Sequence, residues 1–306
     1  MTTEGILLPG QGSQFEGMGR DWCEAFDVAR ETFAEADEAL GFALTEACWS
    51  SGDEVNRTDV AQPGIFTTSV AILRVLESRG LKLADAALCA GLSLGEYTAL
   101  WAAGSLEFAD GLRLVRLRGE AMQDASEANP SSMVSLMGAD EETAGKLAAL
   151  GAEHGVCSVA NLNAPGQVVV SGELAALDAV EAAAKEHGVR RAVRLTVAGG
   201  FHSECMRPAA DRLAAALTEV EIRAPRTTFL SNVNGGPVTD PEQIRQQLAQ
   251  QVCAPVLWER SMRWALENGV RSFLEPGPGN VLGGILRKID REAVVRSAAT
   301  PGDLTD

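Results

Sequence analysis

The chain has 306 residues and a formal net charge of -16, from 26 Lys and Arg against 42 Asp and Glu. This charge repels nucleic acids and anionic membranes, so neither is an expected partner. Hydrophobic residues make up 46% of the chain but form no membrane-spanning run, and the N-terminus lacks the pattern of a secretion signal. We therefore expect a cytoplasmic protein. We also expect two lobes, because a chain of this length seldom folds around a single hydrophobic core.

Cysteine and histidine usage argues against a metal centre. The chain has only three histidines, and its six cysteines form no CxxC pair: Cys23, Cys48, Cys89, Cys157, Cys205 and Cys253. Such scatter supplies neither a zinc ligand set nor a secreted disulfide framework. We expect reduced thiols, no metal site and no cofactor.

The first 125 residues are predicted to be mostly helical around two short strands. GILLPG at residues 5–10 has the pattern of a buried strand entering a glycine-rich turn. Pro63 is expected in the first turn of a helix that Gly80 ends. The apolar run at 87–90 is predicted to be a strand, and it leads directly into GLSLGEY at 91–97.

A different pattern begins near residue 129. Strands are predicted at 133–138, 155–162, 167–172 and 189–197, with helices at 141–154 and 174–187. This βαββαβ order is typical of a ferredoxin-like unit. Strands at 227–233 and 270–275 and a helix at 281–289 follow. We therefore predict an α/β fold in which a ferredoxin-like small lobe (129–198) is inserted into an α/β-hydrolase-like large lobe (1–128 and 199–306) with a parallel sheet.

The GLSLGEY stretch predicts a nucleophile at Ser93. A G-x-S-x-G sequence between a strand and a helix is the context of a nucleophile elbow, in which small residues allow the sharp turn that exposes the serine hydroxyl. The alternative is a tight glycine turn with an incidental serine. The strand and helix on either side favour the nucleophile.

His202 is the expected base, by elimination. His154 and His187 are the last residues of the two predicted helices, where a histidine suits the negative end of the helix dipole. His202 instead lies in the loop AGGFHSE, and a nucleophilic serine needs a nearby base. No loop acid stands in the usual place, so a backbone carbonyl is a candidate for orienting the ring.

PGQGSQ at residues 9–14 is the expected source of an oxyanion donor. A dinucleotide fingerprint would need glycine where Phe15 stands, so a nucleotide-dependent oxidoreductase is disfavoured. In elbow enzymes one donor comes from such a loop and the other from the residue after the nucleophile. This nominates the main-chain amides of Gln11 and Leu94.

Taken together, these motifs resemble the malonyl-CoA:acyl carrier protein transacylases of type II fatty acid synthesis. The resemblance covers nearly the whole chain and rests on eight motifs in order: PGQGSQ (9–14), GLSLGEY (91–97), RLRGEAMQ (116–123), NAPGQVVVSG (163–172), GGFHS (199–203), SNVNG (231–235), QQVCAPVLW (250–258) and EPGPGNVL (275–282).

The resemblance implies a two-step transfer through a serine ester. Ser93 would take malonyl from the substrate malonyl-CoA as an ester. The phosphopantetheine thiol of acyl carrier protein would then remove the malonyl group from the serine. His202 would be general base and acid, with the backbone carbonyl of Gln251 holding its ring. Gln11 and Leu94 would form the oxyanion hole.

The resemblance also implies substrate contacts. Arg118 matches the arginine that binds the malonyl carboxylate, and a guanidinium can pair with a carboxylate through two hydrogen bonds. Its alternative is a solvated helix face, which is the expectation for Arg113 and Arg116. Further substrate contacts, each with an alternative as core or turn residue, fall at Met122, Asn161, Asn163 and Gln167.

One position departs from the family. Leu92 stands where the family usually has histidine before the nucleophile, which leaves the acyl preference open. Phe201, before the catalytic histidine, resembles the malonyl-using form of related polyketide domains, and its ring would leave little room for an α-methyl group.

We expect a monomer that binds malonyl-CoA and an acidic acyl carrier protein. Local basic patches would have to offset the net charge, and the candidates are Arg190, Arg191, Arg194, Arg287, Lys288 and Arg291. A trans-acting polyketide acyltransferase, an acyl-thioester hydrolase with the same Ser/His pair and a silent carrier-binding module remain alternatives.

Overall fold

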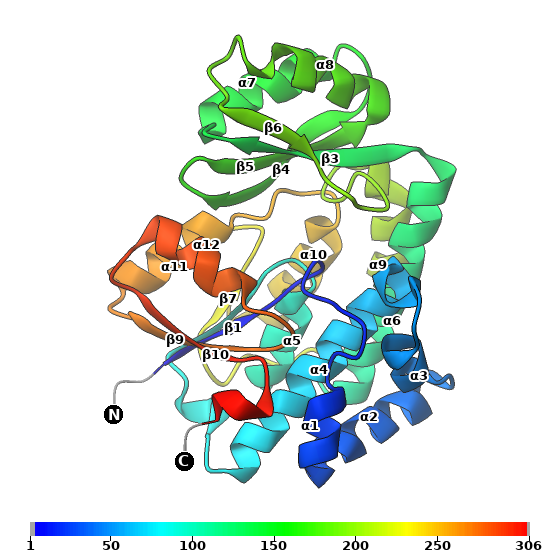
Figure 1. Ribbon diagram of the computed structural model, residues 1–306, viewed down its shortest axis with the longest axis vertical. Coiled ribbons are helices and arrows are strands. Elements are labelled where there is room, and N and C mark those ends of the chain that lie inside the picture. The colour runs from blue at the N-terminus through cyan, green and yellow to red at the C-terminus, as the bar shows by residue number, and fades with distance from the viewer. Residues whose placement is uncertain (1–3, 305–306) are drawn as a thin grey trace.

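The computed structural model describes residues 4–304 as two lobes, each built on its own sheet (Figure 1). The large lobe has a six-stranded sheet in the order β10-β9-β1-β2-β7-β8, in which the pairs from β10 to β7 are parallel and β7 pairs with β8 antiparallel. Its strands are β1 (Gly5–Leu8), β2 (Leu88–Gly91), β7 (Phe229–Ser231), β8 (Gly236–Pro237), β9 (Ser272–Pro276) and β10 (Val294–Ala298).

Ten α-helices surround this sheet in the described part of the large lobe. They are α1 (Arg20–Ala25), α2 (Asp27–Leu40), α3 (Leu44–Trp49), α4 (Thr58–Ser78), α5 (Gly95–Ala102), α6 (Phe108–Ala128), α9 (Arg207–Leu217), α10 (Pro241–Gln251), α11 (Trp258–Glu267) and α12 (Val281–Ile289). The parallel neighbours β1, β2 and β7 end at the same edge of the sheet, and a crevice outside the carboxyl ends of parallel strands is where ligands bind in such folds.

The small lobe has the chain order β3 (Ser131–Met137), α7 (Glu141–Gly151), β4 (Cys157–Ala164), β5 (Gln167–Glu173), α8 (Leu174–Ala184) and β6 (Arg191–Arg194). Its four strands pair antiparallel in the order β4-β5-β3-β6. Alternate strand residues such as Val134, Leu136 and Val170 pack on Leu147 and Leu177 of the two helices. Both helices cover the sheet face that is turned away from the large lobe (Figure 1).

The predicted fold class is confirmed. The βαββαβ order and its antiparallel sheet are present, and the elbow lies between β2 and α5 of a largely parallel sheet. Helices α7 and α8 end three residues earlier than predicted, at Gly151 and Ala184, so His154 and His187 lie in the turns that follow. β10 was not predicted; its strand is half exposed beside β9 and lacks the continuous apolar pattern of a buried strand.

The predicted start of α4 is wrong. Pro63 lies inside the helix, five residues after its first residue Thr58, where it cannot donate to the carbonyl of Asp59. That carbonyl accepts instead from Arg116 Nη1 at 2.5 Å. The sequence predicted that Arg116 lies on a solvated helix face. In the structure its side chain instead supplies the donor that Pro63 lacks.

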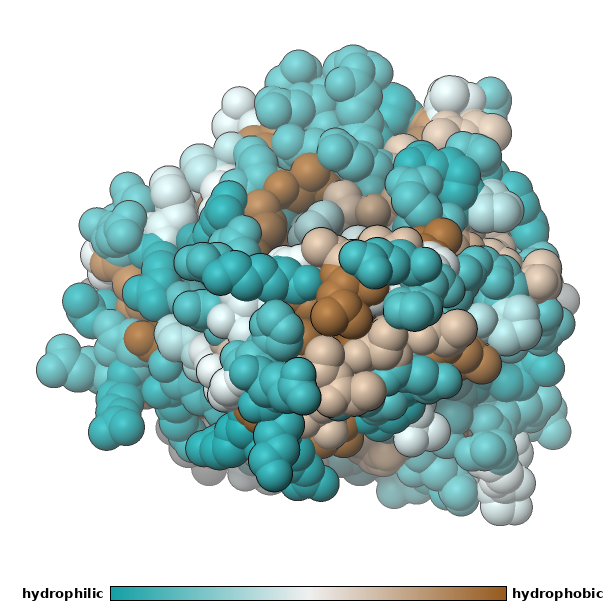
Figure 2. Space-filling model, turned by 90° about the horizontal axis from the view of Figure 1, so that it is seen from above, coloured by the Kyte–Doolittle hydropathy of each residue, from teal (hydrophilic) through white to brown (hydrophobic). Residues whose placement is uncertain are grey.

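The surface around the small lobe is mainly hydrophilic. Figure 2, which views the molecule from the small-lobe end, shows apolar residues only in separate patches between polar side chains. Among the described residues, no helix is both long and apolar enough to cross a membrane. Residues 4–304 also hold no cluster of three or more His, Cys, Asp or Glu side chains that could bind a metal ion.

Candidate active site

The turn at Ser93 depends on two glycines that tolerate no side chain. A Cβ on Gly91 would lie 2.0 Å from the carbonyl carbon of Gly95, and a Cβ on Gly95 would lie 2.2 Å from the carbonyl oxygen of Leu8. Ser93 itself has φ 52°, a conformation that costs a non-glycine residue about 1–3 kcal/mol. The elbow is therefore compact and strained, and its serine lies at the end of β2 facing a cavity.

The structure brings Ser93 and His202 together, although 109 positions separate them. Ser93 Oγ lies 2.8 Å from His202 Nε2, and His202 Nδ1 lies 2.8 Å from the main-chain carbonyl of Gln251. A carbonyl only accepts hydrogen bonds, so Nδ1 carries the proton and Nε2 is free to accept from the hydroxyl. His202 also has a positive φ of 60°. Its loop contacts the small lobe through a hydrogen bond from the N–H of Gly200 to Ser131 Oγ at 2.8 Å.

His202 is buried and neutral. Its side chain is 4% exposed, and burial together with the nearby charge of Arg118 lowers the pKa of the imidazole to about 4. Because this value lies well below neutral pH, the ring is present as the free base. It can therefore accept the proton of Ser93 Oγ without first losing one of its own.

A buried guanidinium lies beside the same hydroxyl. Arg118 donates from Nη2 to Ser93 Oγ at 3.1 Å and to Gln251 Oε1 at 2.9 Å, and from Nη1 to Gln62 Oε1 at 2.7 Å. Burial lowers its pKa, yet an arginine stays protonated in proteins. Within residues 4–304 it forms no ion pair with a carboxylate, so its positive charge is available to an anionic substrate group.

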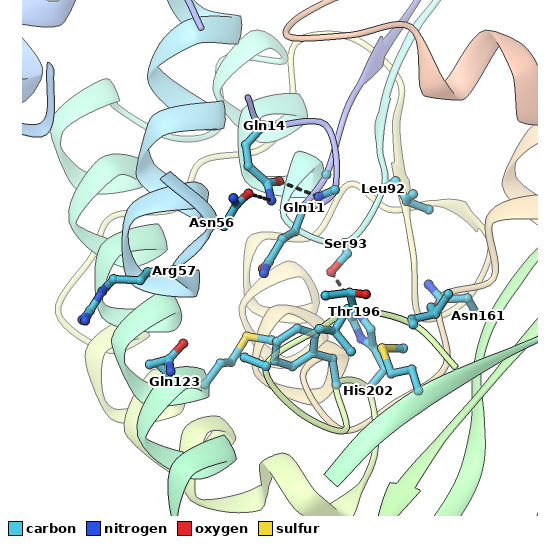
Figure 3. Close-up of a pocket in the computed structure, with 18 of the residues that line it drawn as sticks. Gln11, Gln14, Asn56, Arg57, Leu92, Ser93, Gln123, Asn161, Thr196 and His202 are labelled. Carbon is cyan, nitrogen blue, oxygen red and sulfur yellow. Dashed lines mark hydrogen bonds between the residues drawn. The ribbon is translucent and has the colours of Figure 1, made fainter. Parts of the chain in front are cut away.

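A cavity of about 930 Å³ opens over these groups (Figure 3). Its walls come from both lobes: Gly10, Gln11, Gly12, Gln14, Asp53, Glu54, Asn56, Arg57, Leu92, Ser93, Arg118, Met122, Gln123, Met133, Asn161, Asn163, Val169, Leu195, Thr196, Val197, Ala198, Phe201 and His202. In Figure 3, Gln11 and His202 lie on different sides of Ser93, and Leu92 and Asn161 lie beyond it.

The two proposed oxyanion donors differ in position. Gln11 lines the cavity, whereas Leu94 is fully buried directly before α5 and does not. Neither main-chain N–H has an acceptor within the described part of the chain. A Cβ on Gly10 would lie 2.2 Å from the carbonyl oxygen of Leu92, so the loop after β1 touches the elbow at this point.

Most of the further predicted contacts lie in the cavity wall. Met122 and Phe201 are buried there, and Asn161 and Asn163 reach it from β4. Asn163 Oδ1 is buried without a hydrogen-bond partner. Gln167 does not line the cavity; its Oε1 accepts from Lys288 Nζ at 2.7 Å and links β5 to α12 of the large lobe.

The basic candidates separate into two groups. Arg194 forms ion pairs with Asp178 and Glu181, so its charge is compensated within the small lobe. The other five, which are exposed, form no ion pair with a carboxylate in residues 4–304: Arg190, Arg191, Arg287, Lys288 and Arg291.

Three buried polar residues of the site were not predicted. Gln62 holds both Arg118 and, at 3.5 Å, the side chain of Gln11. Glu96 and Asn232 hold the elbow from below. Glu96 and Asn232 stand inside the GLSLGEY and SNVNG motifs, so the motifs were a signal for them. Gln62 directly precedes Pro63 in α4 and stands in none of the eight motifs.

Comparison with known proteins now gives the class: the chain belongs to the acyl transferase family, whose acyl transferase domain matches residues 7–300. Within it, the similar relatives are malonyl CoA-acyl carrier protein transacylases, as the eight motifs predicted. That of Bacillus subtilis (strain 168) is 38% identical over 303 residues, which cover 98% of this chain and 95% of the relative.

Solved structures similar to this chain are also malonyltransferases. The acyl-carrier-protein S-malonyltransferase of Bartonella henselae superimposes with a TM-score of 0.95 at 39% identity, covering 99% of this chain and 97% of the other. A malonyl transacylase in complex with its type II polyketide synthase acyl carrier protein matches with a TM-score of 0.93 at 37% identity, covering 99% and 97%. The predicted family is therefore confirmed.

Proposed function

We propose that this protein transfers malonyl from coenzyme A to the phosphopantetheine thiol of acyl carrier protein for fatty acid elongation, through an ester on Ser93. The observation that carries the proposal is the place of the hydroxyl: Ser93 Oγ lies 2.8 Å from a neutral imidazole nitrogen and 3.1 Å from a buried guanidinium without a carboxylate partner. The first neighbour activates a nucleophile, and the second suits a substrate that carries a carboxylate.

In the first half-reaction, Ser93 Oγ attacks the thioester carbonyl as His202 Nε2 takes its proton. The carbonyl oxygen becomes an oxyanion, and the free amides of Gln11 and Leu94 are the donors proposed to stabilise it. Collapse breaks the carbon–sulfur bond, and the imidazolium returns its proton to the coenzyme A thiolate. Malonyl remains on Ser93 as an ester.

In the second half-reaction, the carrier thiol gives its proton to His202 and attacks the ester. The serine oxygen leaves and takes the proton back, so the enzyme is regenerated and no cofactor is consumed. These residues belong to one chain, and we propose that a monomer is active.

Two residues are proposed to select the acyl group. Arg118 can hold the distal carboxylate of malonyl through paired hydrogen bonds, and its Nη2 already lies beside Ser93. Phe201, whose ring is buried in the cavity wall, limits the room next to the acyl carbon and disfavours an α-methyl group.

The carrier protein is proposed to dock on the exposed cations that lack carboxylate partners. Arg190 and Arg191 lie on the small lobe and Arg287, Lys288 and Arg291 on or beside α12 of the large lobe. An acidic partner would meet local positive charge here despite the net charge of -16. Reversing Arg190 and Arg191 to glutamate should slow transfer to carrier protein and weaken its salt dependence, with acylation by malonyl-CoA unchanged.

The test is to mix the protein with malonyl-CoA, weigh it intact, and then add acyl carrier protein bearing phosphopantetheine. We expect a malonyl adduct that Ser93→Ala abolishes and that moves to the carrier thiol. No adduct on the wild-type protein contradicts the proposal. Release of free malonate as fast without carrier as with it identifies a thioester hydrolase instead, and preference for a polyketide carrier over a fatty acid carrier identifies a polyketide acyltransferase.

A further inference from the structure

A carboxylate that the cavity does not reach lies under the nucleophile. Glu96, in the first turn of α5, is 1% exposed and does not line the cavity. Its Oε1 accepts from the main-chain N–H of Asn232 at 2.8 Å, and its Oε2 accepts from the side-chain amide of Gln251. Both partners are donors, so this position needs a side chain with two acceptors.

The two partners of Glu96 hold the main chain of the strained serine. Asn232 Oδ1 accepts from the N–H of Ser93 at 2.7 Å, and its Nδ2 donates to the carbonyl of Gly91 at 2.7 Å. Gln251 Nε2 donates to the carbonyl of Ser93 at 2.9 Å. Two residues that donate to one carboxylate therefore hold both polar main-chain groups of a residue at φ 52°.

Gln251 cannot turn its amide to suit a different neighbour. Its Oε1 accepts from Arg118, and a guanidinium has donors only, so Nε2 must face Glu96 and the serine carbonyl. The main-chain carbonyl of Gln251 also accepts from His202 Nδ1. This one glutamine thus contacts the nucleophile, the base and the guanidinium, and Glu96 fixes the end that faces the elbow.

We propose that Glu96 is a positioning residue that acts through Asn232 and Gln251 to maintain the strained turn at Ser93 and the alignment of its hydroxyl with His202. Glu96 touches no reacting atom. The competing explanation is an ordinary stabilising charge at a helix N-terminus, which would affect folding but not the acylation step.

The proposal also has a consequence for pH. Burial raises the pKa of Glu96 to about 7, while its hydrogen bonds with Asn232, Gln251 and the Ser231 hydroxyl and the charge of Arg118 act in the opposite direction. Tyr97 also interacts with it electrostatically; burial raises the pKa of that phenol far above neutrality, so it is uncharged. A proton directed at Asn232 N–H or Gln251 Nε2 would face a donor and break that contact. Acylation should therefore slow as the pH falls through about 7, although His202 with its pKa of about 4 is still a free base.

The decisive variant is Glu96→Gln in the full chain. It keeps the shape but replaces one acceptor by an NH₂ group that faces a donor, so we expect kcat for Ser93 acylation to fall about 10- to 100-fold. KM for malonyl-CoA should change less than about threefold, because the cavity wall is intact. The acidic limb near pH 7 should disappear, since no titrating group remains at position 96. Rates are measured by quenched single-turnover intact mass between about pH 5 and 8.

The matched control is Glu142→Gln, which removes an exposed first-turn carboxylate from α7 and leaves the elbow untouched. Its kcat and pH profile should equal those of the wild-type protein. Asn232→Ala should lower kcat like Glu96→Gln but keep the acidic limb, because the carboxylate is still present. A normal kcat and a retained limb in Glu96→Gln overturn the proposal.

Folding failure of one variant does not remove the test, because Glu96→Gln and Asn232→Ala weaken the same support of the Ser93 main chain from different residues. A normal kcat in whichever variant folds contradicts the proposal, and a lowered kcat with an unchanged KM supports it. The inference rests on the proposed acylation of Ser93. If the wild-type protein forms no malonyl adduct, the proposed function fails; if it does and Glu96→Gln is normal, only this inference fails.

Discussion

The elbow of the large lobe and the turns of the small lobe solve the same backbone problem in different ways. In residues 129–198 every described residue with a positive φ is glycine: Gly138, Gly155, Gly166 and Gly188. At the candidate active site, Ser93 and His202 adopt φ of 52° and 60° despite their side chains. The small lobe avoids strain, whereas the site retains it at the proposed nucleophile and the proposed base.

The surroundings of the two regions differ in the same sense. The small-lobe core consists of apolar side chains such as Val134, Leu147 and Leu177. Their packing depends on shape and volume, not on the direction of hydrogen bonds. The floor of the elbow consists of buried polar side chains whose hydrogen bonds have fixed directions. Strain persists only where the surroundings over-determine a conformation, and here directional bonds do so.

The largest effect is expected from Gly95→Ala, which adds a methyl group where the elbow has no room for one. Its Cβ would meet the Leu8 carbonyl oxygen at 2.2 Å, and main-chain atoms cannot move aside cheaply. We expect a loss of about 3 kcal/mol in the free energy of unfolding. Displacement of the serine should slow acylation about 100-fold or more. Urea unfolding and single-turnover acylation measure both. Gly284→Ala, where a Cβ meets nothing within 4 Å, is the control and should leave activity unchanged.

Arg118→Lys tests whether the polar residues around Ser93 need the fixed hydrogen-bond directions of a guanidinium or only its positive charge. Lysine keeps the charge but cannot contact Gln62, Gln251 and a substrate carboxylate in the fixed planar arrangement of a guanidinium. We expect kcat/KM for malonyl-CoA to fall about 10- to 100-fold. A value close to wild type would show that a point charge is enough.

A pair of glycines in the small lobe tests whether its turns depend on backbone conformation only. Neither Gly188 nor Gly145 has an atom within 4 Å of a built Cβ, but Gly188 has φ 79° while Gly145 lies inside α7. Gly188→Ala should cost about 1 kcal/mol of stability. Gly145→Ala should add about 0.5–1 kcal/mol. Thermal unfolding of both variants measures the contrast, and equal effects would refute it.

The smallest effect is expected from the strain at the nucleophile itself. Ser93→Ala and Ser93→Gly both remove the hydroxyl, but only glycine accepts φ 52° freely. We expect Ser93→Gly to be more stable than Ser93→Ala by about 0.5–1 kcal/mol. Denaturant midpoints give the difference, and a more stable Ser93→Ala would mean that the turn carries no strain.

Local patterns were sufficient for much of the fold. The helix at 281–289 has the predicted bounds, and the βαββαβ order follows from alternating and helical periodicities. The start of α4 was not accessible in this way, because the Asp59 carbonyl that Pro63 leaves without a helical donor accepts from Arg116, which lies far along the chain. A local rule cannot anticipate a distant donor.

The site divides along the same line. Ser93 and His202 could be nominated because a nucleophile needs a base and the chain has three histidines, and the structure brings their side chains together. Glu96 and Asn232 could not, although both stand in recognised motifs, because their roles depend on burial and on partners more than 130 positions away. Sequence patterns reveal residues that react more readily than residues that hold them in place.

The loop of His202 has a mechanical consequence. Gly200 is tied to Ser131 at the start of the small lobe, whereas Ser93 follows a strand of the large lobe. The loop that carries the proposed base therefore contacts the small lobe, so a shift of that lobe would reach the gap between His202 Nε2 and Ser93 Oγ. A foreign insert between residues 129 and 198 would remove this support from the His202 loop even if the large-lobe wall of the cavity were preserved.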